Sequence, residues 1–252
     1  MDFAKVLAAE LNVPEQYVKA AIDLIDEGNT IPFIARYRKE ATNAMDDQVL
    51  RELADRLDYL RGLEKRKQEV SNTITELGAM TEELQKALET AKTLAEVEDI
   101  YRPYKPKRKT RASVAKARGL EPLAQAIFAQ DATLNVEVEA EKYLNEEVPD
   151  VASALAGARD IIAEQVSDDA KLRAELRKFY GAFGQIKSKA AKEEDSVYAG
   201  YYDFAEPVSK IAGHRVLALD RGEREEFLKV SVEVEAERAC GVAQWMFVKK
   251  NG

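Results

Sequence analysis

The longest regular pattern in the chain runs from Asp46 to Leu77, and it predicts one long helix. Apolar residues recur there every three or four positions, and only the stretch around Lys67 interrupts them: Leu50, Leu53, Leu57, Leu60, Leu63, Val70, Ile74 and Leu77. Asp47 suits the positive end of the helix dipole, and Gly78 suits a left-handed helix end. A helix of about 30 residues would be about 45 Å long, so we expect a spine for other helices or half of a helical pair.

Helical spacing also marks most of the chain from Leu7 to Phe179. Near the start, two short helices are expected on either side of Pro14, which suggests a helix-turn-helix-like part. A plain helical hairpin is the stronger interpretation, because only Gln16 and Lys19 could contact a DNA groove and the other polar positions are acidic. Pro32 disfavours helix before it, so residues 29–45 are expected to form an anchored loop.

The period changes to two near the C-terminus, where Leu228, Val230, Val232 and Val234 alternate with polar residues. This pattern predicts a strand with one apolar face, and its only plausible mate is the weak run at 183–187. The expected fold class is therefore mainly α: an elongated multi-helical region with a helix-turn-helix-like part, a long central helix and minor β structure near the C-terminus.

Positive charge gathers in one run, "IYRPYKPKRKTRASVAKARG", although the chain as a whole carries a net charge of −8. The run contains no acid and eight basic residues: Arg102, Lys105, Lys107, Arg108, Lys109, Arg111, Lys116 and Arg118. Without these eight, 30 Lys and Arg would face 46 Asp and Glu, a net charge of −16. Pro103 and Pro106 exclude regular helix, so an exposed arm stiffened by proline is expected.

This arm is the leading candidate for a nucleic-acid site. Clustered cations bind phosphate backbones through counterion release, and tyrosine rings stack on unpaired bases. The expected contact residues are Tyr101, Arg102, Tyr104, Lys105, Lys107, Arg108, Lys109 and Arg111. Two alternatives stay open: internal neutralisation of neighbouring acidic helices, and docking on an acidic protein surface.

A second, weaker candidate lies at Arg36, Arg38 and Lys39. There the favoured interpretation is structural, with Arg36 or Arg38 bound to a helix carboxylate.

No pattern indicates an enzyme, a cofactor or a metal. His214 and Cys240 are the only residues of their types, so a zinc site cannot form and no disulfide can close within the chain. Cys240 is expected to be a small buried residue. Phosphate-binding glycine motifs are absent. The sequence shows no signal peptide and no apolar run of about 18 residues, so a cytoplasmic protein without membrane contact is expected.

Three regions are expected: a helical region at 1–125 with a basic loop at 101–118, a second helical region at 126–225, and the start of a truncated following domain at 226–252. The last expectation rests on Trp245, Met246, Phe247 and Val248, which are large apolar residues near the end of the chain.

Several long motifs resemble the Tex family of bacterial transcription accessory proteins. They appear in family order: IPFIARYRKEATNAMDD, LRELADRLDYLRGLEKRK, VEDIYRPYKPKRKTRA, ARGLEPLA, ALAGARDIIAE and YYDFAEPVSKIAGHRVLALDRGE. The resemblance covers nearly all of the chain. It departs from the family at "IAGHR", where members usually have Pro and Ser before His214, which puts the local turn in doubt.

The resemblance implies a nucleic-acid-binding transcription factor whose full-length members also carry ribonuclease-H-like, helix-hairpin-helix and S1 domains. None of those domains is in this sequence. The expected partners are RNA or DNA, bound weakly and without sequence preference. The alternative is a protein-interaction scaffold that contacts the transcription machinery.

Overall fold

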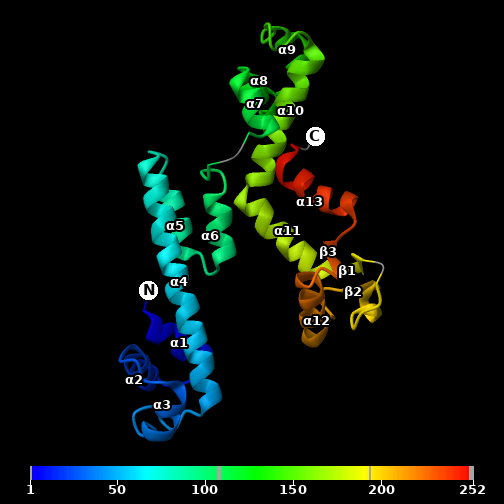
Figure 1. Cartoon of the computed structure of the whole chain (residues 1–252). Coiled ribbons are helices and arrows are strands. Elements are labelled where there is room, and N and C mark those ends of the chain that lie inside the picture. The colour runs from blue at the N-terminus through cyan, green and yellow to red at the C-terminus, as the bar shows by residue number, and fades with distance from the viewer. Residues whose placement is uncertain (1, 107–108, 193, 250–252) are drawn as a thin grey trace. The chain divides into compact units, whose positions relative to one another are not determined.

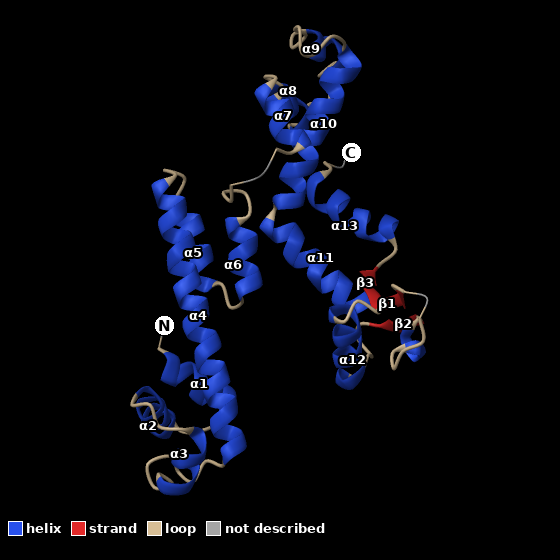
Figure 2. Cartoon of the chain, viewed as in Figure 1, coloured by secondary structure: helices blue, strands red, loops and turns tan. Residues whose placement is uncertain are grey.

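The computed structural model describes residues 2–106, 109–192 and 194–249. Contacts within the chain divide it into two compact units, Met1–Tyr101 and Arg102–Gly252. Helices dominate both units, and the described strands all lie in the second one (Figure 1; Figure 2). The mainly α class with minor β structure near the C-terminus is thus confirmed. No described helix is long and apolar enough to cross a lipid bilayer.

All the regular secondary structure described in the first unit is helical. Its described helices are α1 (Phe3–Leu11), α2 (Glu15–Asp26), α3 (Ile31–Tyr37), α4 (Asp47–Glu76), α5 (Glu82–Thr90) and α6 (Leu94–Tyr101).

Helix α4 is the long helix that the leucine pattern predicted. The Asp46 side chain begins it by accepting a hydrogen bond from the Val49 amide at 2.9 Å. Gly78 follows its end at φ +66°, a conformation that favours glycine. The apolar positions of the pattern are buried as far as Ile74, while Leu77 is 59% exposed.

Helices α1, α2 and α3 pack against α4 around a shared apolar core (Figure 1). Two bidentate ion pairs reinforce this packing, Arg56 with Glu10 at 2.7 and 2.8 Å and Arg61 with Asp26 at 2.8 and 2.7 Å. The hydrogen bonds from these arginines hold the pKa of each carboxyl group below its ordinary value of 4.5 or 3.8. Because the folded-state pKa is lowered, this stabilisation is present above those values and is lost as pH falls through the lowered pKa.

Helix α3, Ile31–Tyr37, occupies part of the segment 29–45 that was expected to be a loop, and turns and irregular backbone cover the rest. Pro32 lies in its first turn, where a backbone N–H has no helical partner and proline is tolerated. The expected bond from Arg36 or Arg38 to a carboxylate is also wrong among the described residues. The Arg36 guanidinium lies 6.0 Å from the Tyr37 ring, and that of Arg38 lies 5.4 Å from the Phe33 ring.

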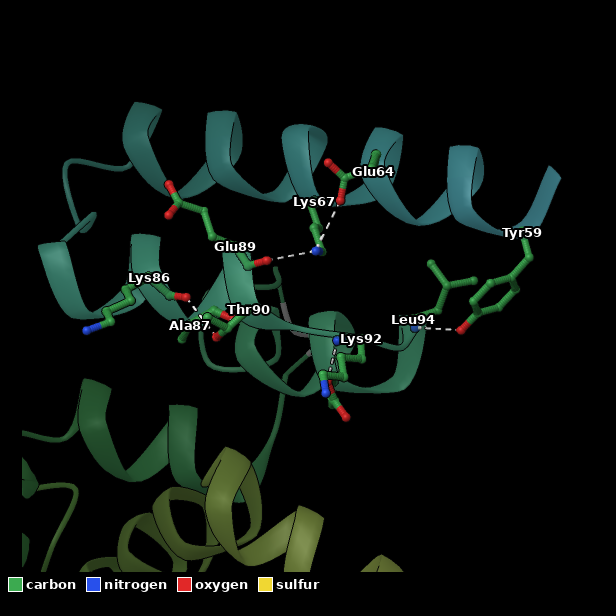
Figure 3. Close-up of polar contacts among 10 residues, drawn as sticks. Tyr59, Glu64, Lys67, Lys86, Ala87, Glu89, Thr90, Lys92 and Leu94 are labelled. Carbon is green, nitrogen blue, oxygen red and sulfur yellow. Dashed lines mark hydrogen bonds and ion pairs between the residues drawn. The ribbon is translucent and has the colours of Figure 1, made fainter. Parts of the chain in front are cut away.

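Polar contacts link α5 and α6 to α4 (Figure 3). Lys67, the interruption in the leucine pattern, is only 8% exposed. Its ammonium group donates to the Glu89 carbonyl at 3.0 Å and lies 3.1 Å from the Glu64 carboxylate (Figure 3). The Tyr59 hydroxyl accepts a bond from the Leu94 amide at 3.2 Å. Lys67 therefore ties the end of α5 to the spine.

The second unit combines a helical part with a small sheet. Its described elements are α7 (Arg111–Ala117), α8 (Glu121–Phe128), α9 (Val136–Glu141), α10 (Val151–Asp168), α11 (Ala170–Phe183), β1 (Gln185–Ala190), the 3-10 turn η1 (Ala199–Tyr201), β2 (Asp203–Pro207), α12 (Gly213–Arg224), β3 (Leu228–Glu233) and α13 (Ala236–Phe247).

Helix α10 organises the helical part, since α7, α8, α9 and α11 all contact it (Figure 1). Its contact with α7 uses small buried residues, Ala112 and Ala115 from α7 against Ala154 and Ala158 from α10. At Gly157 a Cβ atom would lie 2.4 Å from Leu120 Cδ1, so only glycine allows this approach without a shift.

The sheet has the order β2-β1-β3, and both pairs are antiparallel. The strand predicted near residue 228 and its mate near residue 185 are both present and paired, with Ile186 opposite Val232. Edge strand β2 was not expected, because the short run "DFAEP" carries two acids and a proline.

Helix α13 contacts α11, and its last residue, Phe247, packs against Phe128 of α8 at 6.1 Å between ring centroids. The Gln130 side chain donates to the Phe247 carbonyl at 2.7 Å. Residues 228–247 therefore contribute β3 and α13 to the second unit, and Phe247 has a partner within the chain. Trp245 is 76% exposed. The three regions expected from the sequence stay a prediction about domain organisation.

Replacing Lys67 with methionine should lower the free energy of unfolding. The variant keeps the apolar stem but removes the bond from the buried Lys67 ammonium group to the partly buried Glu89 carbonyl, a loss of about 1–3 kcal/mol. Urea denaturation of the Lys67→Met variant measures this loss. Lys65→Met, two residues away on the exposed face, is the matched control and should change stability by no more than about 0.5 kcal/mol. Equal stabilities for the two variants would contradict the role assigned to Lys67.

Candidate nucleic-acid interface

The basic arm, residues 102–111, joins α6 to α7. A turn covers residues 102–104, and no helix forms again before Arg111 in the described part of the arm, as the two prolines predicted. Lys107 and Arg108, two of the expected contact residues, lie outside the described residues. The other expected residues can be placed one by one.

Arg102 anchors the start of the arm. Its guanidinium Nε lies 2.8 Å from Asp168 Oδ1, and that carboxylate belongs to the last residue of α10. The Asp168 side chain is only 10% exposed, whereas that of Arg102 is 47% exposed. The arginine expected to touch phosphate is therefore already paired, and it holds the arm against α10.

The two tyrosines differ from the exposed stacking platforms that the sequence suggested. Tyr101 ends α6, and the Arg66 guanidinium lies 5.3 Å from its ring centroid. Both Tyr101 and Tyr104 are half-buried. Neither ring is fully open to a base in this conformation.

Lys105, Lys109 and Arg111 carry the exposed charge of the arm, and none of the three forms an ion pair within the described part of the chain. Arg111 is placed precisely because it opens α7. The Thr110 hydroxyl accepts from the Ser113 amide at 3.0 Å, and the Ser113 hydroxyl accepts from the Thr110 amide at 2.9 Å. This reciprocal cap fixes the backbone around Arg111, the first residue of α7.

The two cations beyond the arm have acidic partners. Lys116 lies 3.0 Å from the Glu121 carboxylate, and Arg118 lies 3.9 Å from that of Glu147. Of the six basic residues of the run that the structure describes, three are thus paired and three are not. Internal neutralisation, one of the open alternatives, accounts for half of them.

Two clefts with different charge flank this region. One has a volume of about 400 Å³ and is lined by Pro103, by one cation, Lys116, and by four carboxylates, Glu121, Glu164, Asp168 and Asp169. The other, which we call the cationic groove, lies between α7 and α10 and measures about 480 Å³. Lys109, Arg111 and Arg118 line it on one side, and Ser153, Ala156 and Asp160 line it on the α10 side.

The sequence pattern identified the cations but missed the α10 residues around them. Asp168 stands 66 positions after Arg102, and Asp160 stands about 50 positions after Arg111. No local signal links residues so far apart. Arg118 was part of the basic run but was not among the expected contacts.

No group of three or more His, Cys, Asp or Glu side chains is placed to hold a metal ion within the described ranges. Cys240 is exposed, which corrects the expectation that it is buried. The arrangement favours electrostatic binding.

Two family models match most of the chain. The Tex-like protein N-terminal domain matches residues 1–75, and the Tex central region-like model matches residues 131–249. The basic arm lies between these matched spans, and the α10 side of the cationic groove lies within the second.

Relatives match nearly the full chain. It is 41% identical over 249 residues to the protein YdcI of Bacillus subtilis and 42% identical over 238 residues to the transcriptional accessory protein Tex of Neisseria gonorrhoeae. It is 30% identical over 246 residues to the human S1 RNA-binding domain-containing protein 1. These alignments cover 96%, 93% and 92% of this chain, but only 35%, 31% and 24% of the relatives. The chain therefore spans about a third of the length of its bacterial relatives.

Removing the Asp168 charge should loosen the basic arm. In the Asp168→Asn variant, Arg102 loses an ion pair worth about 1 kcal/mol, which corresponds to about a five-fold larger open population. Limited trypsin digestion followed by mass spectrometry should show cleavage after Lys109, which precedes Thr110, accelerated by a similar factor. Glu146→Gln removes an exposed acid elsewhere in the second unit and should leave this rate unchanged. Equal cleavage rates in Asp168→Asn and the parent would show that this ion pair does not hold the arm.

Proposed function

Because the chain belongs to the Tex family, we propose that it is a nucleic-acid-binding part of a transcription accessory factor and that its basic arm contacts phosphate backbones without reading the base sequence. The observation that carries this proposal is a set of three exposed cations in a strongly acidic chain. They are Lys105, Lys109 and Arg111, which have no ion-pair partner in the described ranges.

The distribution of partners supports a binding role for these cations. A solvated surface normally mixes both signs of charge, and the cations at the start and end of the run do have acidic partners. Within the arm, Lys105, Lys109 and Arg111 have no ion-pair partner among the described residues. Clustered charge of this kind releases counterions when it meets a phosphate backbone, which is a favourable and sequence-independent contribution.

The proposed binding is weak and nonspecific. Lysine and arginine fix position on phosphates, whereas base recognition needs side chains held in a groove by a regular element. Nonspecific contacts typically give dissociation constants of about 10⁻⁴ to 10⁻⁶ M at physiological salt. The acidic remainder of the chain weakens binding further, since it repels nucleic acid.

The names of two relatives agree with this proposal. One is called a transcriptional accessory protein, and another is named for an S1 RNA-binding domain. For this chain we propose binding alone, without catalysis. A protein-interaction scaffold is the competing function, in which the same arm would meet an acidic protein surface.

Changing Lys105, Lys109 and Arg111 together to alanine should weaken binding to nucleic acid and reduce its salt dependence. The slope of log affinity against log salt should shrink by about 0.7 to 0.9 for each phosphate that the variant no longer neutralises, hence by about 2 to 3 for three phosphates. Fluorescence anisotropy on several unrelated RNA and DNA sequences measures both quantities. The affinity should fall similarly on all of them.

The matched control is the triple variant Lys19→Ala, Lys65→Ala and Lys86→Ala, whose sites are exposed and lie in the first unit. It removes the same charge and should keep the parent slope. Parent affinity and slope in the arm variant would reject the proposed contact. The scaffold would be favoured by two results together: the arm variant loses affinity for an acidic protein, and nucleic acid fails to displace that protein from the parent chain.

A further inference from the structure

The cationic groove between α7 and α10 is more than a surface of positive charge. It is a cleft of about 480 Å³, within the range of about 300–1,000 Å³ that is typical of small-molecule sites. Figure 1 shows α7 lying beside α10, whose residues form the opposite side of the cleft.

Small residues line both the contact between α7 and α10 and the cleft beside that contact. Ala112, Ala115 and Gly157 bring α7 and α10 into close contact, so the helices themselves leave little room between them. Beside this contact, Ser153 and Ala156 present short side chains to the cleft. Asp150 holds the first turn of α10 by accepting from the Ser153 amide at 2.7 Å, and this bond lowers the pKa of the Asp150 carboxyl. The position of Ser153 is therefore fixed.

The charge of the groove favours an anion. Three cations line it, Lys109, Arg111 and Arg118, against one carboxylate, Asp160. Lys109 and Arg111 have no ion-pair partner among the described residues. Arg118 is 3.9 Å from Glu147, a long contact that a phosphate could replace.

The groove also holds groups that a bare phosphate does not need. The Asp160 carboxylate repels phosphate but accepts hydrogen bonds from sugar hydroxyls and base amino groups, and the Ser153 hydroxyl both donates and accepts. Arginine guanidinium planes stack on unpaired bases. Cations beside a hydrogen-bond acceptor match a nucleoside phosphate better than an inorganic anion or an acidic peptide.

We propose that the cationic groove holds one nucleotide of a single-stranded nucleic acid, with its phosphate against Lys109, Arg111 and Arg118 and its nucleoside over Ser153 and Ala156. This inference rests on the proposed function, since the strand reaches the groove along the basic arm. A duplex does not enter in this way, because its bases are stacked and paired.

The test fills the groove without changing charge. In the Ala156→Leu variant a larger side chain occupies the place assigned to the nucleoside. Ala163→Leu makes the same change at a position of α10 outside the groove and is the control. The probes are fluorescein-labelled octauridylate, a 12-base-pair DNA duplex and uridine 5′-monophosphate as a competitor. Ala156→Leu should weaken octauridylate binding by about ten-fold, the effect of losing one stacked base, and should leave duplex binding and the salt slope unchanged.

The outcomes distinguish a failure of the groove proposal from a failure of the proposed function of the arm. Parent affinity for octauridylate in Ala156→Leu, together with a loss in the triple arm variant, would overturn the groove and leave the proposed function standing. Parent affinity in the arm variant would instead reject the proposed function. Equal losses of affinity for octauridylate and for the duplex would also overturn the proposed nucleotide site in the groove. Competition by uridine monophosphate at concentrations near the octauridylate dissociation constant would overturn it too, because that result indicates a site for free nucleotides. Thermal melting checks folding, and Ser153→Leu repeats the test if Ala156→Leu is unstable.

Discussion

The close packing of α7 against α10 is the constraint on which the interface depends. Small buried residues, among them Ala115 and Ala158, let the two helices meet, and Gly157 leaves no room for a larger residue beside Leu120. This contact sets the position of Arg111 at the start of α7 and the width of the groove beside it. A larger residue at position 157 would displace the Leu120 side chain and press against Ala115 of α7, although it would remove no charge.

The basic residues of the run fall into two groups, those with an acidic partner and those without one among the described residues. Arg102 is tied to Asp168 at the end of α10, and the reciprocal cap of Thr110 and Ser113 fixes the start of α7, so the run is held on both sides of Lys105 and Lys109. The strongly acidic remainder of the chain leaves this region as the favourable place for a phosphate backbone. Fixed anchors with free charge between them favour binding without base recognition.

The sequence predicts a helix or strand well where the spacing of its apolar residues depends only on that element's own geometry. The leucine repeat of α4 and the alternation around Val230 depend only on local period, and both elements formed as expected. Pro32 misled because its effect depends on position: in the first turn of a helix it is tolerated. The partner of Arg102 and the α10 side of the groove could not be predicted, because they come from residues about 50 to 66 positions away that only tertiary packing brings near.

The most direct test of the central claim is photo-crosslinking of an oligonucleotide that contains 4-thiouridine, with the attached peptides identified by mass spectrometry. Binding along the arm and into the groove predicts crosslinks within residues 102–118 and on the α10 peptide that contains Ser153 and Asp160. Crosslinks confined to the first unit, or spread evenly over the chain, would contradict the account.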